Sequence, residues 1–345
     1  MSKILVTGGA GYIGSHVTKQ LLEKEKDIVV LDNLSTGSID TINTLQKIRP
    51  FKFVEIDLKE FDKVDELLKN EDIDTIIHFA ASIVVPESVK NPLKYYLNNT
   101  VNTTNLINSA IKYGVKKFIF SSTAAVYGEP AILPDSGINE DYETKPINPY
   151  GSSKLMSEQV LKDVSKANAD FKYIIFRYFN VAGADINYID NQLSPRIGQS
   201  FPNATHLIKI ASECAVNKRD RMYIFGKDYP TKDGTCIRDY IHVDDLALAH
   251  IKAIDYLEEN DSDIFNLGYG KGASVEEVIK KVKEVTKNDF IVENAPKREG
   301  DPAVLVADNS KFINKFGDIF KYKDLDIICK SAYEWEKLLK ESWAI

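Results

Sequence analysis

The sequence has little cysteine, no long apolar run and no excess of basic residues. Its 345 residues include three cysteines, Cys214, Cys236 and Cys329, which are widely spaced and form no C-x-x-C pair. This pattern predicts reduced thiols in a cytoplasmic setting and argues against a disulfide framework or a zinc site. The formal net charge is −7, which gives no broad basic surface for nucleic acid or an anionic membrane.

The most apolar continuous stretch is too short to span a membrane. It covers residues 76–85 and contains His78 and Ser82, whereas a membrane helix needs about 20 apolar residues. We expect no signal peptide, because a strand pattern already begins near residue 3. His78, His242 and His250 lack the spacing of metal ligands, so we expect structural histidines and no metal site.

The chain does contain a strand, a glycine-rich turn and a helix at its start. Residues 4–6 form a short apolar run, which is typical of a buried strand. Gly8, Gly11 and Gly14 follow, and the pattern then becomes helical. Such a turn lets the backbone approach a pyrophosphate, and the helix offers unpaired N–H groups and a positive dipole end. Glycines also mark ordinary turns, so the turn alone does not identify a ligand.

A carboxylate further along the chain makes the dinucleotide interpretation more specific. A second apolar run, residues 28–31, ends in Asp32, about 20 residues beyond the glycines. A carboxylate there can accept hydrogen bonds from an adenosine ribose and repels a 2′-phosphate. We therefore predict NAD rather than NADP. The glycine spacing is G-x-x-G-x-x-G, which differs from the G-x-G-x-x-G of simple dehydrogenases.

Strand and helix patterns alternate through the first half of the chain. The strand patterns lie at residues 4–6, 28–31, 51–56, 75–79, 117–121 and 173–177, and helical patterns lie at 61–69, 92–113 and 149–167. This alternation predicts an α/β fold with a doubly wound parallel (Rossmann) sheet. Asn91 before Pro92 and Asn148 before Pro149 are the expected starts of two of the helices.

The pattern becomes less regular after about residue 180. We predict an NAD-binding Rossmann domain over residues 1–180 and a smaller C-terminal α/β substrate domain over residues 181–345. No clean linker separates the two, and residues 236–262 are a candidate segment for returning to the first domain. The polar residues 183–203 are expected to form a loop over a cleft.

A tyrosine and a lysine four residues apart provide candidate acid–base chemistry. Tyr150 and Lys154 would share one helix face, and an ammonium beside a phenol lowers the phenol pKa from about 10 towards neutrality. Tyr150 could then accept a proton from a sugar hydroxyl. Residues 121–123, Ser-Ser-Thr, follow the fifth strand, at the edge where open α/β sheets bind ligands. Each pattern alone is common, whereas their combination with the glycine turn is specific.

With these features the chain resembles the extended short-chain dehydrogenase/reductase superfamily and, within it, the UDP-glucose 4-epimerases. The resemblance runs nearly from end to end. Its most specific segments are residues 228–243 and the Arg-Glu-Gly-Asp at residues 298–301. It also covers residues 6–16, 31–34, 77–80, 120–128, 149–155 and 177–180.

The resemblance implies inversion of C4 of a UDP-hexose, with NAD as the resident cofactor, through a transient 4-keto sugar. It implies that Tyr150 takes the proton of the 4-hydroxyl, that Thr123 holds that oxygen, and that Lys154 binds the nicotinamide ribose. The keto sugar then turns and is reduced on its other face, so the net redox change is zero. The resemblance also implies a homodimer formed through the helices at 92–113 and 149–167.

The resemblance further implies a set of ligand-binding residues. For the cofactor, these are Gly8, Gly11, Tyr12, Ile13, Gly14, Asp32, Asn33, Asp57, Leu58, Phe79, Ala80, Ala81, Asn98, Lys154 and Tyr178. For the UDP-sugar, they are Thr123, Tyr150, Asn180, Leu207, Tyr223, Phe225, Arg238, Arg298 and Asp301. The two arginines would clamp the diphosphate by bidentate pairing. The plain alternative is that they form surface ion pairs with Asp239 and Glu299.

Two positions depart from the family pattern. Ile83 lies in the region where some members carry a lysine on the pyrophosphate side, and Leu305 lies where members restricted to plain hexoses carry a tyrosine. The smaller Leu305 predicts room for a 2-acetamido group. UDP-GlcNAc and UDP-GalNAc are therefore candidate substrates beside UDP-glucose and UDP-galactose.

Other functions stay open at this point. A UDP-uronate 4-epimerase would share the fold and would need a pocket for the sugar carboxylate. A non-catalytic sensor of NAD or a nucleotide sugar would not require the Tyr150–Lys154 pair, which is intact here. A nucleotide-sugar 4,6-dehydratase needs an acidic pair directly after Thr123, and Ala124 and Ala125 stand in those places.

Overall fold

The chain divides into two units, each with its own core. The structure, a computed structural model, describes residues 2–130, 137–201, 205–298 and 301–343. The first unit comprises Met1–Gly128, Tyr142–Tyr178 and Ala247–Phe265, and the second comprises Glu129–Asp141, Phe179–Leu246 and Asn266–Ile345. The late segment that groups with the first unit is thus 247–265, where the sequence analysis took 236–262 as its candidate.

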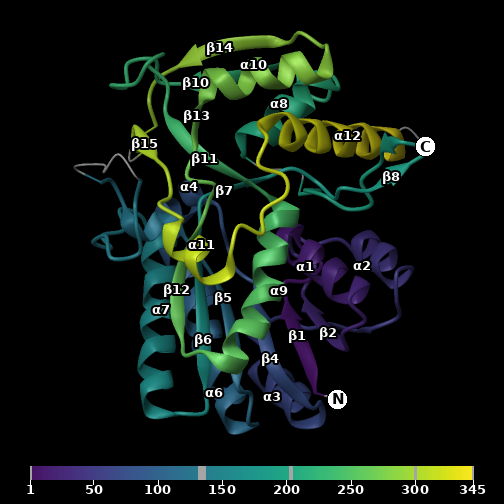
Figure 1. The fold of residues 1–345 in the computed structure, drawn as a ribbon, viewed down its shortest axis with the longest axis vertical. Helices are drawn as coiled ribbons and strands as arrows, with labels where there is room; N and C mark the ends of the chain where they lie inside the picture. The colour runs from purple at the N-terminus through teal and green to yellow at the C-terminus, as the bar shows by residue number, and fades with distance from the viewer. Residues whose placement is uncertain (1, 131–136, 202–204, 299–300, 344–345) are drawn as a thin grey trace. The chain divides into compact units, whose positions relative to one another are not determined.

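A seven-stranded sheet has the order β12-β6-β5-β4-β1-β2-β3 (Figure 1). Its strands are β1 (Lys3–Thr7), β2 (Ile28–Asp32), β3 (Lys52–Glu55), β4 (Ile73–His78), β5 (Lys117–Thr123), β6 (Lys172–Tyr178) and β12 (Asp263–Leu267). The neighbours from β3 through β6 pair in parallel. Strand order runs outward from β1 in both directions, which is the doubly wound arrangement that the sequence predicted.

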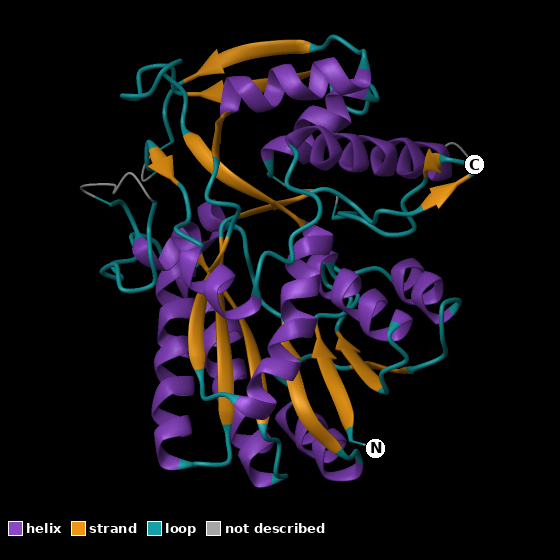
Figure 2. Ribbon diagram, in the orientation of Figure 1, coloured by secondary structure: helices purple, strands orange, loops and turns teal. Residues whose placement is uncertain are grey.

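Helices lie alongside these strands, as Figure 2 shows. They are α1 (Tyr12–Glu23), α2 (Ile39–Gln46), α3 (Phe61–Asn70), α4 (Val85–Lys90), α5 (Pro92–Tyr95), α6 (Asn102–Lys112), α7 (Pro149–Ala167) and α9 (Val243–Glu259), with a 3₁₀ turn η2 (Ala124–Tyr127). The core of the first unit gathers fully buried strand and helix side chains, including Leu5, Val29, Ile76, Phe118 and Leu161. The alternating pattern missed α2 and α4, which are only 8 and 6 residues long.

The stretch 92–113 is helical as predicted, from Pro92 to Lys112, but it is not α-helical throughout. It consists of α5, a π-helical turn η1 (Tyr96–Val101) and α6. Asn91 makes no side-chain cap, whereas Asn148 Oδ1 accepts a hydrogen bond from Gly151 N at 2.9 Å at the start of α7. A π turn is wider than an α turn and often marks a functional site. Here it coincides with Asn99, whose buried amide exchanges hydrogen bonds with Ser82 and donates to Ser153.

The second unit has smaller sheets and its own helices. The elements are β7 (Asn180–Ala182), β8 (Tyr188–Ile189), β9 (Gln192–Leu193), α8 (Leu207–Ala215), β10 (Arg221–Phe225), β11 (Ile237–His242), β13 (Gly272–Ser274), α10 (Val275–Thr286), β14 (Ile291–Ala295), β15 (Val304–Leu305), α11 (Ser310–Phe316) and α12 (Leu325–Trp343). β11 pairs with β7, β13 and β15, and β10 pairs with β14 in parallel. Helices α8, α10 and α12 enclose a core that includes Ala211, Val278 and Cys329.

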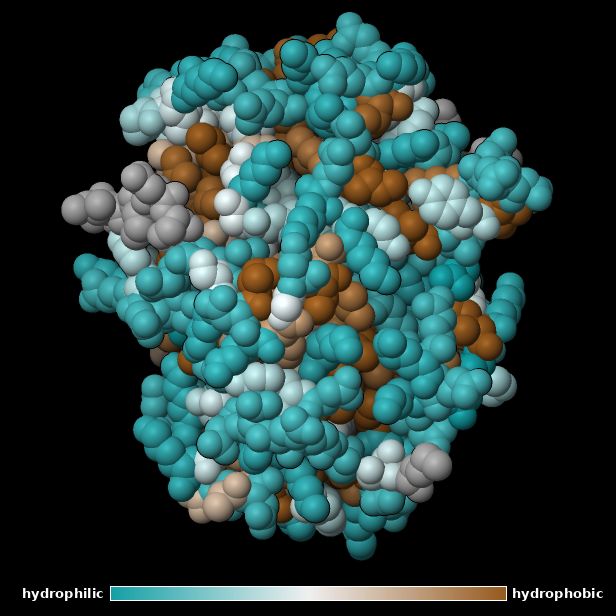
Figure 3. All heavy atoms as spheres, viewed as in Figure 1, coloured by the Kyte–Doolittle hydropathy of each residue, from teal (hydrophilic) through white to brown (hydrophobic). Residues whose placement is uncertain are grey.

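The surface is mainly polar on the face drawn in Figure 3, where hydrophobic residues form smaller patches. Within the described ranges, no helix combines the length and hydropathy needed to cross a bilayer. The same residues contain no group of three or more His, Cys, Asp or Glu side chains arranged to hold a metal ion. Cys214, Cys236 and Cys329 are free and buried.

His78, the last residue of β4, links β1 to α6. Its Nδ1 lies 2.6 Å from Thr7 Oγ1, and its Nε2 lies 2.8 Å from Thr103 Oγ1. The ring stacks on Phe120 with centroids 5.8 Å apart. Burial lowers the pKa of His78 to about 3, and the charge of Lys154 acts in the same direction. The imidazole is therefore neutral in the folded protein, and its role here is structural.

This neutral histidine predicts a specific loss of stability in mild acid. The folded-state pKa of about 3 lies below the ordinary 6.5, so the contribution is complete above pH 6.5 and is lost as pH falls towards 3. At pH 5.5 the loss is about 1.4 kcal/mol. Urea unfolding of the wild type and of His78→Asn at pH 7.5 and 5.5 measures it. The difference in unfolding free energy between the two should shrink by about 1.4 kcal/mol, and a pH-independent difference would contradict the assignment.

Candidate functional site

The glycine turn after β1 is closed so tightly that side chains do not fit. Gly8 has a φ of +73°, and a Cβ on it would lie 2.7 Å from the amide nitrogen of Ala80. A Cβ on Gly14 would lie 2.1 Å from the carbonyl oxygen of Gly8, which also accepts a hydrogen bond from Gly11 N at 3.1 Å. Gly11 is the N-cap of α1 and provides no side-chain cap. The cap position of α1 thus has no side-chain acceptor, an arrangement that suits an anion.

Asp32 connects the glycine turn to the end of β2. It is 6% exposed, and its two carboxylate oxygens accept hydrogen bonds from Ala10 N at 2.9 Å and Leu34 N at 2.8 Å. Burial raises the pKa of Asp32, and these backbone donors oppose the shift. Gly11 and Asn33 add two further backbone hydrogen bonds to the carboxylate. Its roughly four acceptor positions thus all face backbone donors of the turn, and ribose hydroxyls would share these oxygens.

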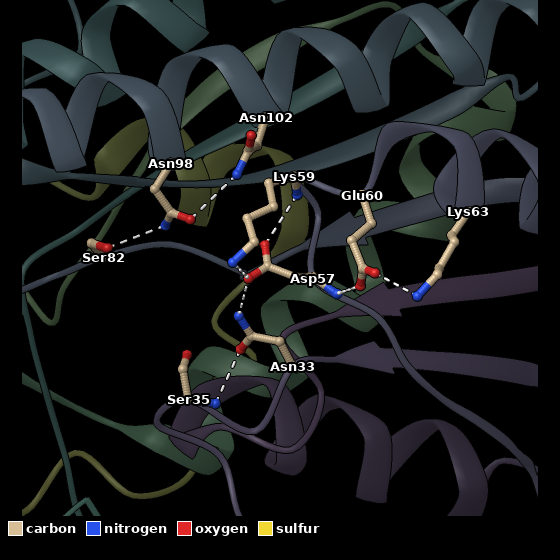
Figure 4. Close-up of polar contacts among 9 residues, drawn as sticks. All are labelled: Asn33, Ser35, Asp57, Lys59, Glu60, Lys63, Ser82, Asn98 and Asn102. Carbon is tan, nitrogen blue, oxygen red and sulfur yellow. Dashed lines mark hydrogen bonds and ion pairs between the residues drawn. The ribbon is translucent and has the colours of Figure 1, made fainter.

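Asn33 and Asp57 follow neighbouring strands, and their side chains point toward each other in Figure 4. Asn33 Nδ2 donates to Asp57 Oδ2 at 3.0 Å, and Lys59 N donates to Asp57 Oδ1 at 3.0 Å. Burial alone would raise the pKa of Asp57, but hydrogen bonds from Lys59 and Asn33 lower it overall. Leu58 between them is buried. The hydrogen-bonded side chains of Asn33 and Asp57 thus lie next to Asp32, just after the ends of β2 and β3.

Phe79, Ala80 and Ala81 leave the end of β4 beside the glycine turn. Phe79 N donates to Thr7 O at 2.9 Å, which brings the segment next to β1. On η1, Asn98 Nδ2 donates to Ser82 Oγ at 3.2 Å, as Figure 4 shows. The expected cofactor residues described so far thus follow the ends of β1, β2, β3 and β4 or lie on η1.

Tyr150, Lys154 and Thr123 meet at the end of β5. Lys154 Nζ donates to Ser121 O at 2.7 Å, and the Thr123 hydroxyl forms a hydrogen bond with Tyr150. Thr123 Oγ1 also accepts a hydrogen bond from Ala125 N at 3.1 Å, which caps η2. The two groups expected to hold and deprotonate one substrate oxygen are thus adjacent.

The charges of this group differ from the expectation. Burial raises the pKa of Tyr150, and the Thr123 hydrogen bond lowers it in part. Burial lowers the pKa of Lys154 to about 7, with Glu158 acting in the opposite direction. In this structure the Lys154 ammonium donates to Ser121 O, and the effect of its charge on the phenol stays a prediction.

Several residues that support this site were missed by the sequence reasoning. A Cβ on Gly151 would lie 2.6 Å from Ala125 O, so this glycine lets the start of α7 approach η2. Asn99 donates to Ser82 O and Ser153 Oγ, each at 3.0 Å, and ties η1 to α7. Of the residues expected at the cofactor, Tyr178 is buried at the end of β6, and its hydroxyl contacts His250 Nε2. Tyr12 and Ile13 lie in the first turn of α1.

In the second unit, Arg238 has a partner other than that of the plain alternative. Arg238 on β11 forms an ion pair with Asp301, whereas Asp239 accepts hydrogen bonds from backbone N–H groups. The Arg298 guanidinium lies over the Phe225 ring at 3.9 Å. Glu299 lies outside the described residues. Both cations are thus bound to residues that were themselves expected at the substrate.

Asn180 and Leu207 line one small cavity of about 20 Å³ in the second unit. Tyr223 and Phe225 lie two residues apart on β10, and their ring centroids are 6.4 Å apart. Asn180 pairs with Tyr240 on β11, two residues beyond Arg238. Leu305 on β15 pairs with Arg238, next to the expected phosphate clamp. The substrate residues expected in this unit thus form two groups. Asn180, Arg238, Asp301 and Leu207 lie around β11, and Tyr223, Phe225 and Arg298 lie at β10.

The donor set of the first unit fits a dinucleotide. The turn that excludes side chains, the start of α1 and the carboxylate of Asp32 supply close backbone approach, anion donors and ribose acceptors in the order that a dinucleotide requires. Beside it, a phenol, a hydroxyl and an ammonium can bind and deprotonate a hydroxyl group.

Comparisons with known proteins agree with this arrangement. The model of the NAD dependent epimerase/dehydratase family matches residues 4–268. A UDP-glucose 4-epimerase of Azospirillum brasilense is 45% identical over 341 residues, which cover 99% of this chain and 93% of the relative.

Solved structures are similar over the whole chain. The UDP-Glc/GlcNAc 4-epimerase of Campylobacter jejuni has a TM-score of 0.84 and 57% identity, covering 98% of this chain and 100% of that chain. A UDP-glucose 4-epimerase of Stenotrophomonas maltophila, with bound NAD and formylated UDP-arabinopyranose, has a TM-score of 0.92 and 33% identity, covering 99% of this chain and 100% of that chain. From its glycine turn to its second unit, the chain belongs to the NAD dependent epimerase/dehydratase family.

Proposed function

We propose that this chain is a UDP-glucose 4-epimerase, an enzyme that interconverts UDP-glucose and UDP-galactose. The observation that carries the proposal is the meeting of Tyr150, Thr123 and Lys154 at the end of β5. The curated relative and both solved structures described above are 4-epimerases of UDP-sugars by name. The cofactor is NAD, which fits the donor set of the first unit.

The chain's own groups account for the proton movements. Tyr150 as phenolate takes the proton of the C4 hydroxyl, and Thr123 holds the same oxygen by a hydrogen bond. Bound NAD supplies the chemistry of accepting the hydride from C4 and giving it back. In the return direction Tyr150 gives its proton to the oxygen of the 4-keto sugar. With a pKa of about 7, Lys154 carries positive charge for much of the time at neutral pH, which favours the phenolate.

We infer that the first unit holds the cofactor and the second holds the UDP part of the substrate. Arg238 and Arg298 supply cationic donors for the diphosphate, although the chain as a whole is acidic. Asp301 is the candidate partner of the uridine ribose. Inversion requires the sugar to turn while the nucleotide stays bound, so contacts should be strong at UDP and weak at the hexose.

Replacing Tyr150 by Phe tests the proposal directly. Loss of the phenolic oxygen removes the proton carrier, so kcat for UDP-galactose should fall by about 10²–10⁴-fold, with bound NAD and thermal stability retained. Separation of UDP-glucose from UDP-galactose by chromatography measures turnover. Tyr188→Phe is the control, since Tyr188 is 57% exposed on the β8–β9 hairpin. Full activity of Tyr150→Phe would contradict the assignment.

We also propose that the enzyme accepts UDP-N-acetylhexosamines. Leu305 stands where hexose-restricted members carry tyrosine, and the similar Campylobacter jejuni protein is a UDP-Glc/GlcNAc 4-epimerase by its title. Leu305→Tyr should lower kcat/KM for UDP-GalNAc at least tenfold relative to UDP-galactose. Leu305→Met is the control of similar volume and should keep both activities. A wild type that does not turn over UDP-GalNAc would end this proposal.

A row of exposed apolar side chains supports a homodimer. Leu93, Leu97 and Val101 recur at helical spacing along α5 and η1, and they are 70%, 59% and 43% exposed. Met156 on α7 is 48% exposed. Single exposed apolar side chains are common, but a row of them is typical of a protein interface. We propose that these two segments pair with the same segments of a second copy.

Charge on this row should break the dimer. Sedimentation of the wild type should give the mass of two chains, and Leu93→Glu with Leu97→Glu should give the mass of one. Ile189→Glu is the control, because Ile189 is 57% exposed but lies in the second unit. A monomeric wild type, or a dimeric double variant, would contradict the proposed interface.

We place the enzyme in the cytoplasm, because its three cysteines are free thiols and reduced cysteines are the norm there. Cell fractionation with an antibody to the chain measures this, and recovery from an oxidising compartment would contradict it.

A further inference from the structure

Three side chains on one face of α7 contact three consecutive residues of β5. Tyr150, Lys154 and Glu158 are spaced four residues apart, so they lie in a line along the helix. They meet Thr123, Ser121 and Ser122 respectively. The first two contacts belong to the catalytic group. The third, between Ser122 Oγ and Glu158 Oε1 at 2.5 Å, has no role in the reaction described above.

Glu158 is fully buried and is held by more than Ser122. Arg177 on β6 donates to both of its oxygens, from Nε at 3.1 Å and from Nη2 at 2.7 Å. Arg177 is 2% exposed, donates from Nη1 to the Tyr127 hydroxyl at 3.0 Å and lies over the Tyr127 ring. This bidentate pairing fixes the carboxylate in position as well as in charge. Glu158 therefore joins α7 to both β5 and β6 directly behind the catalytic residues.

The charges around Lys154 show why this position matters. Burial lowers the pKa of Lys154, and the carboxylate of Glu158 raises it. Of the other groups facing this region, His78 on β4 is neutral, and Tyr150 on α7 and Tyr178 on β6 are phenols whose pKa values burial raises.

We propose that Glu158 is a positioning residue for the epimerisation, which holds α7 in the register at which Lys154 meets Ser121 and Tyr150 meets Thr123. Its negative charge also maintains Lys154 as an ammonium in a buried site. The inference rests on the proposed function, because the register of these contacts affects activity only if the chain catalyses the epimerisation. Glu158 acts through Lys154 and Tyr150 and has no contact of its own with the reacting atoms.

Two substitutions separate charge from position. Glu158→Gln keeps the shape and removes the charge; Glu158→Asp keeps the charge and shortens the reach. In the NAD-bound enzyme, we expect kcat for UDP-galactose to fall at least tenfold in both, with KM within twofold of wild type. In Glu158→Gln alone, the alkaline limb of the kcat–pH profile should move down by about one pH unit, because activity requires Lys154 to keep its proton.

A direct titration of Lys154 gives a readout that does not depend on turnover. The side-chain resonances of ¹³Cε-labelled lysines are followed by NMR against pH, and Lys154 is assigned by its loss in Lys154→Met. The midpoint should fall by about one unit in Glu158→Gln and stay close to wild type in Glu158→Asp. Asp163→Asn is the matched control, because Asp163 is an exposed carboxylate on the same helix, and it should change neither kcat nor the midpoint.

The outcomes are distinct. Unchanged kcat and midpoint in a folded Glu158→Gln enzyme would overturn the inference and leave Glu158 with a merely structural role. If that variant does not fold because Arg177 is left unpaired, Glu158→Gln with Arg177→Met removes both charges and should show the same lower midpoint. A wild type without turnover would instead overturn the proposed function, whereas an unchanged midpoint would overturn only this inference.

Discussion

The structure depends most on the contact between the first half of α7 and the end of β5. β5 lies between β4 and β6 in parallel pairing, so the positions of Ser121 and Thr123 are set by the sheet. Hydrogen bonds from α7 to these residues transfer that fixed position to Lys154 and Tyr150. A catalytic group built on a central strand and a packed helix is held more exactly than one built on loops.

Close backbone approach is the second constraint, and it recurs on both sides of the site. Gly14 lets the start of α1 approach the turn after β1, and Gly151 lets the start of α7 approach η2. In each case a Cβ would lie within 2.6 Å of a carbonyl oxygen. The two glycines have different consequences. Gly14 leaves the start of α1 to an anion, whereas Gly151 brings Tyr150 toward Thr123. The glycine turn and the catalytic group thus both depend on a glycine position at which a Cβ would clash with a carbonyl oxygen.

Much of this could be predicted from the sequence because it follows from local patterns. The strand–turn–helix at the start, Asp32 after β2 and the spacing of Tyr150 from Lys154 each have a short-range signature with a known physical reason. The sheet order then follows from alternation and right-handed crossovers. The roles of the individual ligand-binding residues came from the family resemblance, and they stay proposals.

What the sequence could not provide depends on long-range contacts. The π turn at η1 reflects the bonds of Asn99 to Ser82 and Ser153, which no helical period reveals. The ion pair of Arg238 with Asp301 joins residues far apart in the chain, where local reasoning offered Asp239. Glu158 could have been noticed, since it continues the four-residue spacing of Tyr150 and Lys154, but its bidentate pairing with Arg177 depends on the placement of β6 beside β5.

The central claim is that C4 is oxidised and reduced again within one enzyme complex, with Tyr150 moving the proton. Turnover of UDP-galactose carrying deuterium at C4, followed by mass spectrometry of the UDP-glucose formed, tests it most directly. The account predicts that the deuterium stays at C4 in the product and that none appears in water or in free cofactor. Loss of the label to solvent would mean that C4 is inverted by proton abstraction, and the account would be wrong.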